Sequence, residues 1–303
     1  MFLGKNEDCL PCRIGDLLRL DELIDLHVHT NASDGSCTPS ELVGHVARAG
    51  IRTFAVADHD TVAAVPEAIR LASEAGLRCL PAIEITAVFE GKDVHVLGYF
   101  IDPEHRPLLT FVADSRADRV RRARTMCERL AELGVPVDFE GLLAGVGGPN
   151  SGKAIARPVV ARSLVEAGHV RTIQEAFDLY LADGRPAYCA RIGASPAEVV
   201  GVIREAGGIA SLAHPGPLGK DHLIPMMASH GLAAIECFHS DHDEAAQTKY
   251  LEHARRFGLA VTGGSDFHGP GTRRAEFFGK VSLPHTHYQD FVARAGKRAL
   301  ADG

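Results

Sequence analysis

The chain has 303 residues, of which 46% are hydrophobic and 23% are charged, and its formal net charge is −7. No run of about 18 apolar residues is present, which excludes a helix that spans a membrane, and the first residues lack the apolar core of a signal peptide, so a cytoplasmic protein is expected. The negative charge disfavours the wrapping of long duplex nucleic acid but allows a small phosphorylated ligand to bind at a local basic cluster.

Residues 1–20 are expected to be an N-terminal extension outside the folded domain. They contain the sequence Cys9-Leu10-Pro11-Cys12, but no second cysteine pair completes a zinc site, so no metal is expected there. The chain has seven cysteines, and their odd number and scattered positions favour reduced thiols over a disulfide framework.

Residues 21–104 alternate short β-branched or apolar runs with helical patterns. Thr38 is a predicted N-cap, followed by Pro39 at the first helical position and by Glu41, which completes a capping box. The predicted strands are Ile24–Val28, Ile51–Ala57, Leu77–Ile85 and Val94–Ile101, and the predicted helices run from Thr38 to Gly50 and over Val62–Ala75.

Residues 105–190 are mostly helical in pattern and are interpreted as an insertion that covers a substrate site. Helices are predicted over Ser115–Leu133, Val159–Ala167 and Ile173–Leu181, with a Gly-rich loop over residues 145–150.

Strand–helix alternation resumes over residues 191–303. The predicted strands here are Gly208–Ala213, Leu232–Phe238 and Leu259–Gly264, and the predicted helices are Pro196–Ala206 and Glu244–Phe257. Repeated βα units require crossover connections, so the sequence predicts an α/β fold with a mainly parallel sheet that is closed or nearly closed.

Imidazole and carboxylate side chains recur where the predicted strands end. Because such ends converge on one mouth of a parallel barrel, we expect these groups to meet. Burying so many of them without a cation would cost desolvation and mutual repulsion, so metal ions are predicted. Asp34 lies in the loop after the first strand and His95 at the start of the fourth, and they are expected to join the residues at strand ends. The predicted metal ligands are His27, His29, Asp34, His59, Glu84, His95, His214, Asp266 and His268.

The segments DLHVHT, SDG, ADHD, PAIEIT, HVLGY, LAHP and GGSDFH together resemble the PHP (polymerase and histidinol phosphatase) superfamily. The insertion, with RPVVARSLVEAGHV and FDLYLADGRPAYCA, resembles the stand-alone nucleotide phosphoesterases related to RNase AM, although the usual RPH reads Arg157-Pro158-Val159 here. This resemblance implies a distorted (β/α)7 barrel with a helical insertion domain and up to three metals. It also implies 3′,5′-nucleoside bisphosphate phosphatase or 5′→3′ exonuclease activity on short RNA.

The resemblance further implies how the ligands divide among the metals. His27, His29, Glu84 and Asp266 would hold the first ion, and Glu84 would bridge to a second ion held by His95 and His214. A third ion would be held by Asp34, His59 and His268. Because no thiolate is among the ligands, Mn²⁺ is the expected cofactor, with Fe²⁺ or Zn²⁺ as alternatives.

The expected reaction is attack on phosphorus by a water that the metal ions have made acidic. Asp58, Asp60 and His239 are candidates to orient that water or to protonate the leaving group, or else to fix the ligands. A histidinol-phosphate phosphatase, or another small phosphomonoesterase, is the alternative activity. A non-catalytic scaffold and an amide hydrolase are less favoured.

Basic residues of the insertion are candidates for substrate binding, since an arginine fork suits a phosphate. The candidates are Lys153, Arg157, Arg191 and His239. A further arginine cluster over residues 116–129 covers most of its helix circumference, so most of these side chains should be solvated, while one could lean over the site. The expected partner is a nucleotide or short oligoribonucleotide bound by a monomer.

Overall fold

The computed structural model describes residues 22–148, 155, 157–190 and 193–299. Within them, one sheet has its strands in sequence order from β1 to β7. The strands are β1 Leu23–Val28, β2 Ile51–Val56, β3 Arg78–Phe89, β4 Lys92–Tyr99, β5 Ile209–Leu212, β6 Ala234–His239 and β7 Ala260–Gly264. The sheet is nearly closed, because Val28, the last residue of β1, forms a parallel bridge with Phe267 after β7.

The sheet is mainly parallel, as predicted, but β4 runs antiparallel to both β3 and β5. The β3–β4 connection is a two-residue turn in which Glu90 and Gly91 both have positive φ, 48° and 72°. This conformation matches the twist of a tight hairpin. The reversal brings the beginning of β4 to the mouth where the parallel strands end.

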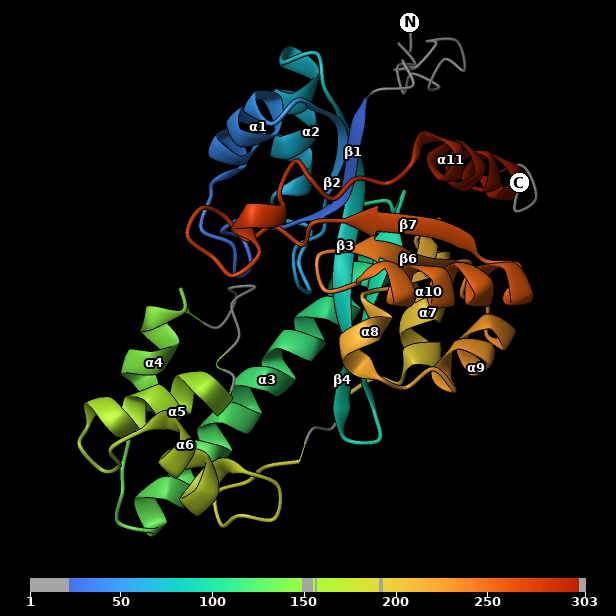
Figure 1. The fold of residues 1–303 in the computed structure, drawn as a ribbon. Helices are drawn as coiled ribbons and strands as arrows, with labels where there is room; N and C mark the ends of the chain where they lie inside the picture. The colour runs from blue at the N-terminus through green and yellow to red at the C-terminus, as the bar shows by residue number, and fades with distance from the viewer. Residues whose placement is uncertain (1–21, 149–154, 156, 191–192, 300–303) are drawn as a thin grey trace, which may run out of the picture.

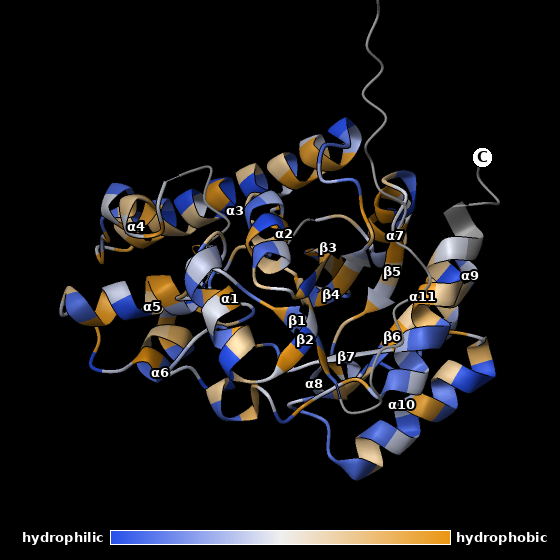
Figure 2. Cartoon of the chain, turned by 90° about the horizontal axis from the view of Figure 1, so that it is seen from above, coloured by the Kyte–Doolittle hydropathy of each residue, from blue (hydrophilic) through white to orange (hydrophobic). Residues whose placement is uncertain are grey.

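Helices surround the strands and turn their apolar faces inward (Figure 2). The predicted capping box of α1 is present: the Thr38 side chain accepts a bond from Glu41 N, and the Glu41 side chain accepts one from Thr38 N. The surrounding elements are α1 Pro39–Arg48, α2 Val65–Glu74, α7 Pro196–Glu205, α8 Pro215–Leu218, α9 Leu223–Ser229, α10 Glu244–Phe257, the short 3₁₀ helix η2 Ala275–Phe277 and α11 His285–Ala299.

The helical insertion projects to one side of the barrel on a long helix, α3 (Figure 1). Near the start of α3, Leu108 and Val112 pack into the barrel core, whereas Met126 and Leu130 near its end belong to a separate apolar cluster. The insertion consists of α3 Arg106–Glu132, α4 Phe139–Gly145, α5 Arg157–Glu166, α6 Ile173–Ala176 and the π-helix η1 Phe177–Leu181. Because α3 belongs to both cores, it fixes the insertion relative to the barrel.

Some predicted boundaries were wrong. Helix α3 begins at Arg106 rather than Ser115, because Pro107 suits a first helical turn and Leu108 begins the apolar spacing. The predicted Gly-rich loop is preceded by the unpredicted helix α4, which is capped by the Asp138 side chain.

Among the described residues no helix is both long and apolar enough to cross a membrane. The five described cysteines, which are Cys37, Cys79, Cys127, Cys189 and Cys237, form no disulfide.

Candidate metal centre

The predicted metal ligands come together at one mouth of the barrel. Among the described residues, every group of three or more potential ligand side chains belongs to this one cluster. Groups whose ligand atoms lie within 4.8 Å of one another are His29–Asp34–His59–His268, His27–Glu84–His214, His27–His29–Asp266, His59–Glu84–His95 and His27–Glu236–His239. Side chains separated by up to some 240 positions in sequence therefore share one small volume.

Glu84, at the middle of β3, is the centre of this cluster and is fully buried. Its Oε2 lies 3.3 Å from His27 Nε2 and 3.1 Å from His59 Nδ1. Its Oε1 lies 3.0 Å from His95 Nδ1 and 3.1 Å from His214 Nε2. The two oxygens thus face different imidazoles, an arrangement suited to a carboxylate that bridges two cations.

Asp266, which follows β7, contacts the two histidines at the end of β1. Its Oδ1 lies 3.0 Å from His29 Nε2 and 3.6 Å from His27 Nε2. Asp266 has a φ of 56°, and His214 has a φ of 27°, both unusual for residues other than glycine. Such strained backbone gathers at functional sites, where the surrounding structure holds it in place.

Asp34, His59 and His268 form the most open part of the cluster. His268 Nε2 lies 3.1 Å from Asp34 Oδ1, and His59 Nε2 lies 3.8 Å from Asp34 Oδ2. The Asp34 side chain is 47% exposed, against 1% for Glu84. A substrate can therefore approach the centre from this side.

Several buried atoms of the cluster lack a hydrogen bond. They are both ring nitrogens of His29, Nδ1 of His59, Nδ1 of His95 and Oδ1 of Asp266. Buried polar atoms are rarely left unsatisfied unless a ligand or ion completes them. Imidazole nitrogens and carboxylate oxygens, with no thiolate, are a donor set for divalent cations such as Mn²⁺, Fe²⁺ or Zn²⁺. The residues present therefore fit a multinuclear metal centre.

The charges within the cluster are strongly coupled. Burial alone would raise the pKa of Glu84, but His59, His95 and His27 hold it well below its usual range. Burial lowers the pKa of His59 to about 4, against the attraction of Glu84. The cluster thus combines an ionised carboxylate with a neutral imidazole, which are the forms that bind metals.

Two buried acids behind the ligands had no role in the sequence-based site. Glu236 Oε1 lies 3.0 Å from His27 Nδ1, and its Oε2 accepts a bond of 2.8 Å from His214 N. Asp25 accepts bonds from both the backbone and the hydroxyl of Ser265, and burial raises its pKa to about 6. Asp25 and Glu236 are each the third residue of a six-residue strand, β1 and β6, so a search restricted to strand ends passes over them.

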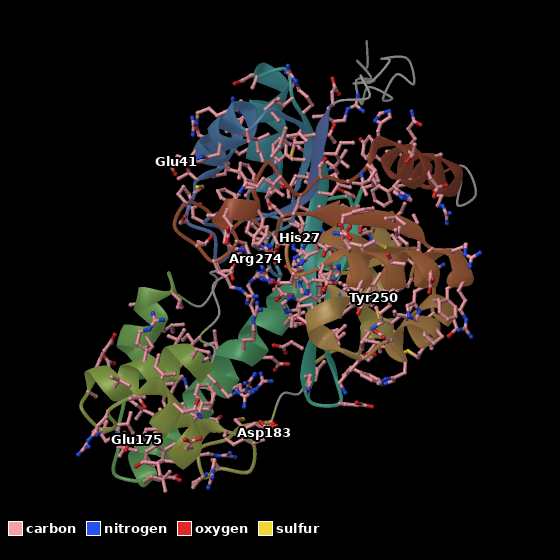
Figure 3. The ribbon with its side chains drawn as sticks, in the orientation of Figure 1. His27, Glu41, Glu175, Asp183, Tyr250 and Arg274 are labelled. Carbon is pink, nitrogen blue, oxygen red and sulfur yellow. The ribbon has the colours of Figure 1, made fainter. Side chains whose placement is uncertain are left out.

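Arg274 also contacts the centre and was not singled out from the sequence. Its guanidinium pairs with Asp266 and, at 2.5 Å, with Asp241 Oδ2. Figure 3 labels it close to His27. Arg274 lies on the connection after β7, next to the short helix η2, where no strand end or motif marks it.

The three candidate catalytic residues lie in different surroundings. Asp58 is buried against the loop after β1, where it accepts bonds from Thr30 and Ser33. Asp60 pairs with Arg119 of α3 and accepts a bond of 3.1 Å from Thr86 N. His239 lies inside the cluster, with Nε2 3.4 Å from Asp266 Oδ2.

The predicted substrate-binding residues are only partly covered by the structure. Lys153 and Arg191 lie outside the described residues. Arg157 pairs with Asp183 at 2.9 Å within the insertion, and Figure 3 shows Asp183 well away from His27. Of the arginine cluster on α3, two members reach the barrel: Arg119 pairs with the Asp60 carboxylate and Arg116 donates to the Asp60 carbonyl oxygen.

Comparison with known proteins places these features in one family. The family described as PHP domain matches residues 25–136. The chain is 35% identical over 255 residues to the 5′-3′ exoribonuclease Rnm of Salmonella typhimurium, an alignment that covers 82% of this chain and 86% of the relative. It is 34% identical over 253 residues to the 3′,5′-nucleoside bisphosphate phosphatase of Chromobacterium violaceum, covering 82% and 88%. A crystal structure from Bifidobacterium adolescentis, of a protein proposed to be a metal-dependent phosphoesterase, superimposes with a TM-score of 0.75 at 33% identity, covering 90% and 96%.

Proposed function

The chain belongs to the PHP domain family, and on that premise we propose that it is a metal-dependent phosphoesterase acting on nucleotides. The substrates proposed are 3′,5′-nucleoside bisphosphates, from which it would remove the 3′-phosphate, and short RNA, which it would degrade from the 5′ end. The support for both activities is the similarity of the chain to an exoribonuclease and to a bisphosphate phosphatase. A cytoplasmic monomer that does not engage long duplexes is part of the same proposal.

The observation that carries the proposal is Glu84, whose two oxygens are divided among five imidazoles. The ligand partition proposed is the one implied by the family resemblance, with Glu84 bridging two ions and Asp34, His59 and His268 holding a third. Bound Mn²⁺ would supply Lewis acidity toward the phosphoryl oxygens and would lower the pKa of water.

His239 is the residue proposed to move a proton. Its Nδ1 accepts a bond of 3.0 Å from Asp241 N, so a neutral ring carries its proton on Nε2. That nitrogen faces the cluster, where it can donate to a leaving oxygen. Asp58 and Asp60 are proposed to position the site, Asp58 by holding the loop after β1 and Asp60 by holding α3.

The test compares turnover of adenosine 3′,5′-bisphosphate, a short 5′-phosphorylated RNA and histidinol phosphate by protein loaded with Mn²⁺. We expect the nucleotide substrates to be preferred, and Glu84→Gln to abolish turnover of all three. Preference for histidinol phosphate would overturn the proposed substrate class. Less than one bound metal per chain after loading, measured by mass spectrometry, would instead favour a non-catalytic scaffold.

A further inference from the structure

Arg274 lies between two acidic side chains next to the metal centre. Its Nη1 pairs with Asp266 Oδ2, and its Nη2 pairs with Asp241 Oδ2 at 2.5 Å. Asp266 follows β7 and Asp241 follows β6, so the arginine joins the segments after two neighbouring strands. Because the nitrogens of a guanidinium lie in one rigid plane, this pairing fixes the two carboxylates relative to each other.

The pairing gives different partners to the two oxygens of Asp266. Oδ2 accepts from Arg274 and lies 3.4 Å from His239 Nε2. Oδ1 is buried without a hydrogen bond and lies 3.0 Å from His29 Nε2. The last torsion of an aspartate is broad and roughly two-fold, so either oxygen could otherwise face the proposed ligands. Arg274 removes this choice by holding Oδ2.

His239 is held from both sides by the partners of Arg274. Asp241 N donates to His239 Nδ1 at 3.0 Å, and His239 Nε2 faces Asp266. A donor at Nδ1 leaves the proton of a neutral imidazole on Nε2. The contacts form a closed cycle that consists of Arg274, Asp266, His239 and Asp241. A change at Arg274 would therefore reach both a proposed ligand and the proposed proton donor.

The neighbouring Arg273 contacts one of the same acids from outside. It pairs with Asp241 Oδ1 at 2.7 Å, and its side chain is 80% exposed, against 21% for Arg274. Exposed ion pairs are weak because water screens them and because ordering two long side chains costs entropy. Arg273 thus supplies positive charge to Asp241 without linking it to Asp266, which makes it a matched control for Arg274.

We propose that Arg274 is a positioning residue, which turns Asp266 Oδ1 toward a bound metal ion and keeps His239 in the tautomer that donates from Nε2. The inference rests on the proposed function, in which Asp266 is a ligand and His239 moves a proton. Both terminal nitrogens of Arg274 are used by protein acids. Replacing Arg274 should therefore lower metal affinity and kcat and leave KM nearly unchanged.

Arg274→Lys is the decisive variant, because it keeps the positive charge and loses the fork that joins two acids. Isothermal titration calorimetry with Mn²⁺ should show about tenfold weaker binding, the lower end of the loss seen when a partner of a metal ligand is removed. The kcat for adenosine 3′,5′-bisphosphate should fall by a similar factor, about tenfold, with KM within about twofold. Arg273→Lys should match the wild type in all three quantities.

Two outcomes of this comparison overturn the inference. Wild-type Mn²⁺ affinity and kcat in Arg274→Lys would show that only the charge of Arg274 matters. A raised KM with an unchanged kcat would make Arg274 a substrate contact rather than a positioning residue.

The tautomer of His239 separates this inference from the proposed reaction, since it is measured without turnover. Nitrogen-15 NMR of protein in chelator, with the His239 signals assigned from their absence in His239→Gln, should show Nε2 protonated in the wild type and in Arg273→Lys. Arg274→Lys should show a mixture of the two tautomers. An unchanged signal overturns the inferred hold on His239, whether or not the protein hydrolyses nucleotides. A changed signal with weaker Mn²⁺ binding, but no turnover by the loaded wild type, overturns only the proposed reaction.

Discussion

His27 has a buried carboxylate on each side of its ring. Its Nδ1 lies 3.0 Å from Glu236 and its Nε2 lies 3.3 Å from Glu84. If Nδ1–H donates to Glu236, the lone pair of Nε2 is turned toward the cluster and can bind a cation. Because Glu236 also accepts from the backbone of His214, one acid orients two of the proposed ligands.

Replacing Glu236 with Gln should therefore weaken metal binding without removing a ligand. Loss of the partner of a ligating histidine typically lowers metal affinity by about 10- to 100-fold. Isothermal titration calorimetry with Mn²⁺ measures the change in metal affinity. Glu252→Gln, on the exposed face of α10, should bind as the wild type does. Equal affinities in the two variants would show that Glu236 has no orienting role.

Asp58 should contribute more to stability than to chemistry. Its carboxylate accepts bonds from Thr30 N at 2.8 Å and from the hydroxyls of Thr30 and Ser33, each at 2.5 Å. Asp58→Asn turns one acceptor into a donor and should lower the free energy of unfolding by about 2 kcal/mol. Urea denaturation measures this loss, with the exposed Asp114→Asn as the control. A large fall in kcat with unchanged stability would instead make Asp58 catalytic.

The closure between β1 and β7 determines where His27 and Asp266 meet. Asp266 N donates to the His27 carbonyl oxygen at 2.8 Å. At Gly264, the last residue of β7, an added Cβ would approach His27 N and His27 Cβ more closely than the 3.0 Å limit of real Cβ contacts. Glycine at this position is therefore what allows the two strands to bring their ligands together.

Gly264→Ala should force β1 and β7 apart, lowering both thermal stability and metal affinity. Overpacking of this kind typically costs about 1–3 kcal/mol. Gly201→Ala, in the middle of α7 with open space around it, is the matched control and should stabilise the protein by about 0.5–1 kcal/mol. Thermal denaturation compares the two variants. A Gly264→Ala protein as stable as the wild type would mean that the closure is looser than these contacts imply.

The meeting of the proposed ligands at one mouth could be predicted, because imidazole and carboxylate residues recur near the ends of the predicted strands. Periodicity could not reveal that β4 runs antiparallel. This direction is why His95, predicted to lie near the start of a strand and found as the fourth residue of β4, reaches the mouth. Nor could it locate Arg274, whose loop follows no repeat and whose partners appear only on folding. The start of α3 was misjudged because Leu108 and Val112 pack on the barrel rather than on the insertion.

Barrel and insertion meet around Asp60. This residue follows β2, has a strained φ of 48° and binds two arginines of α3. Its carboxylate also accepts from Thr86, on the strand that carries Glu84. A movement of the insertion would therefore displace Asp60 and, through it, β3. The same contacts hold the arginines of α3 beside β3.

Removing metal should lower the melting temperature of the whole protein. The proposed ligands lie on or next to β1, β3, β4 and β7, so bound ions would join these strands to one another. Metal at about 100 times its Kd stabilises the folded state by about 2.7 kcal/mol for one site. Each kcal/mol shifts Tm by about 2–4 °C in a chain of this size class. Scanning calorimetry should thus show Tm falling by about 5–10 °C in chelator and recovering with Mn²⁺. Glu84→Gln, which removes the carboxylate proposed to bridge two ions, should respond much less. A wild-type Tm that does not change in chelator would contradict the proposed metal centre.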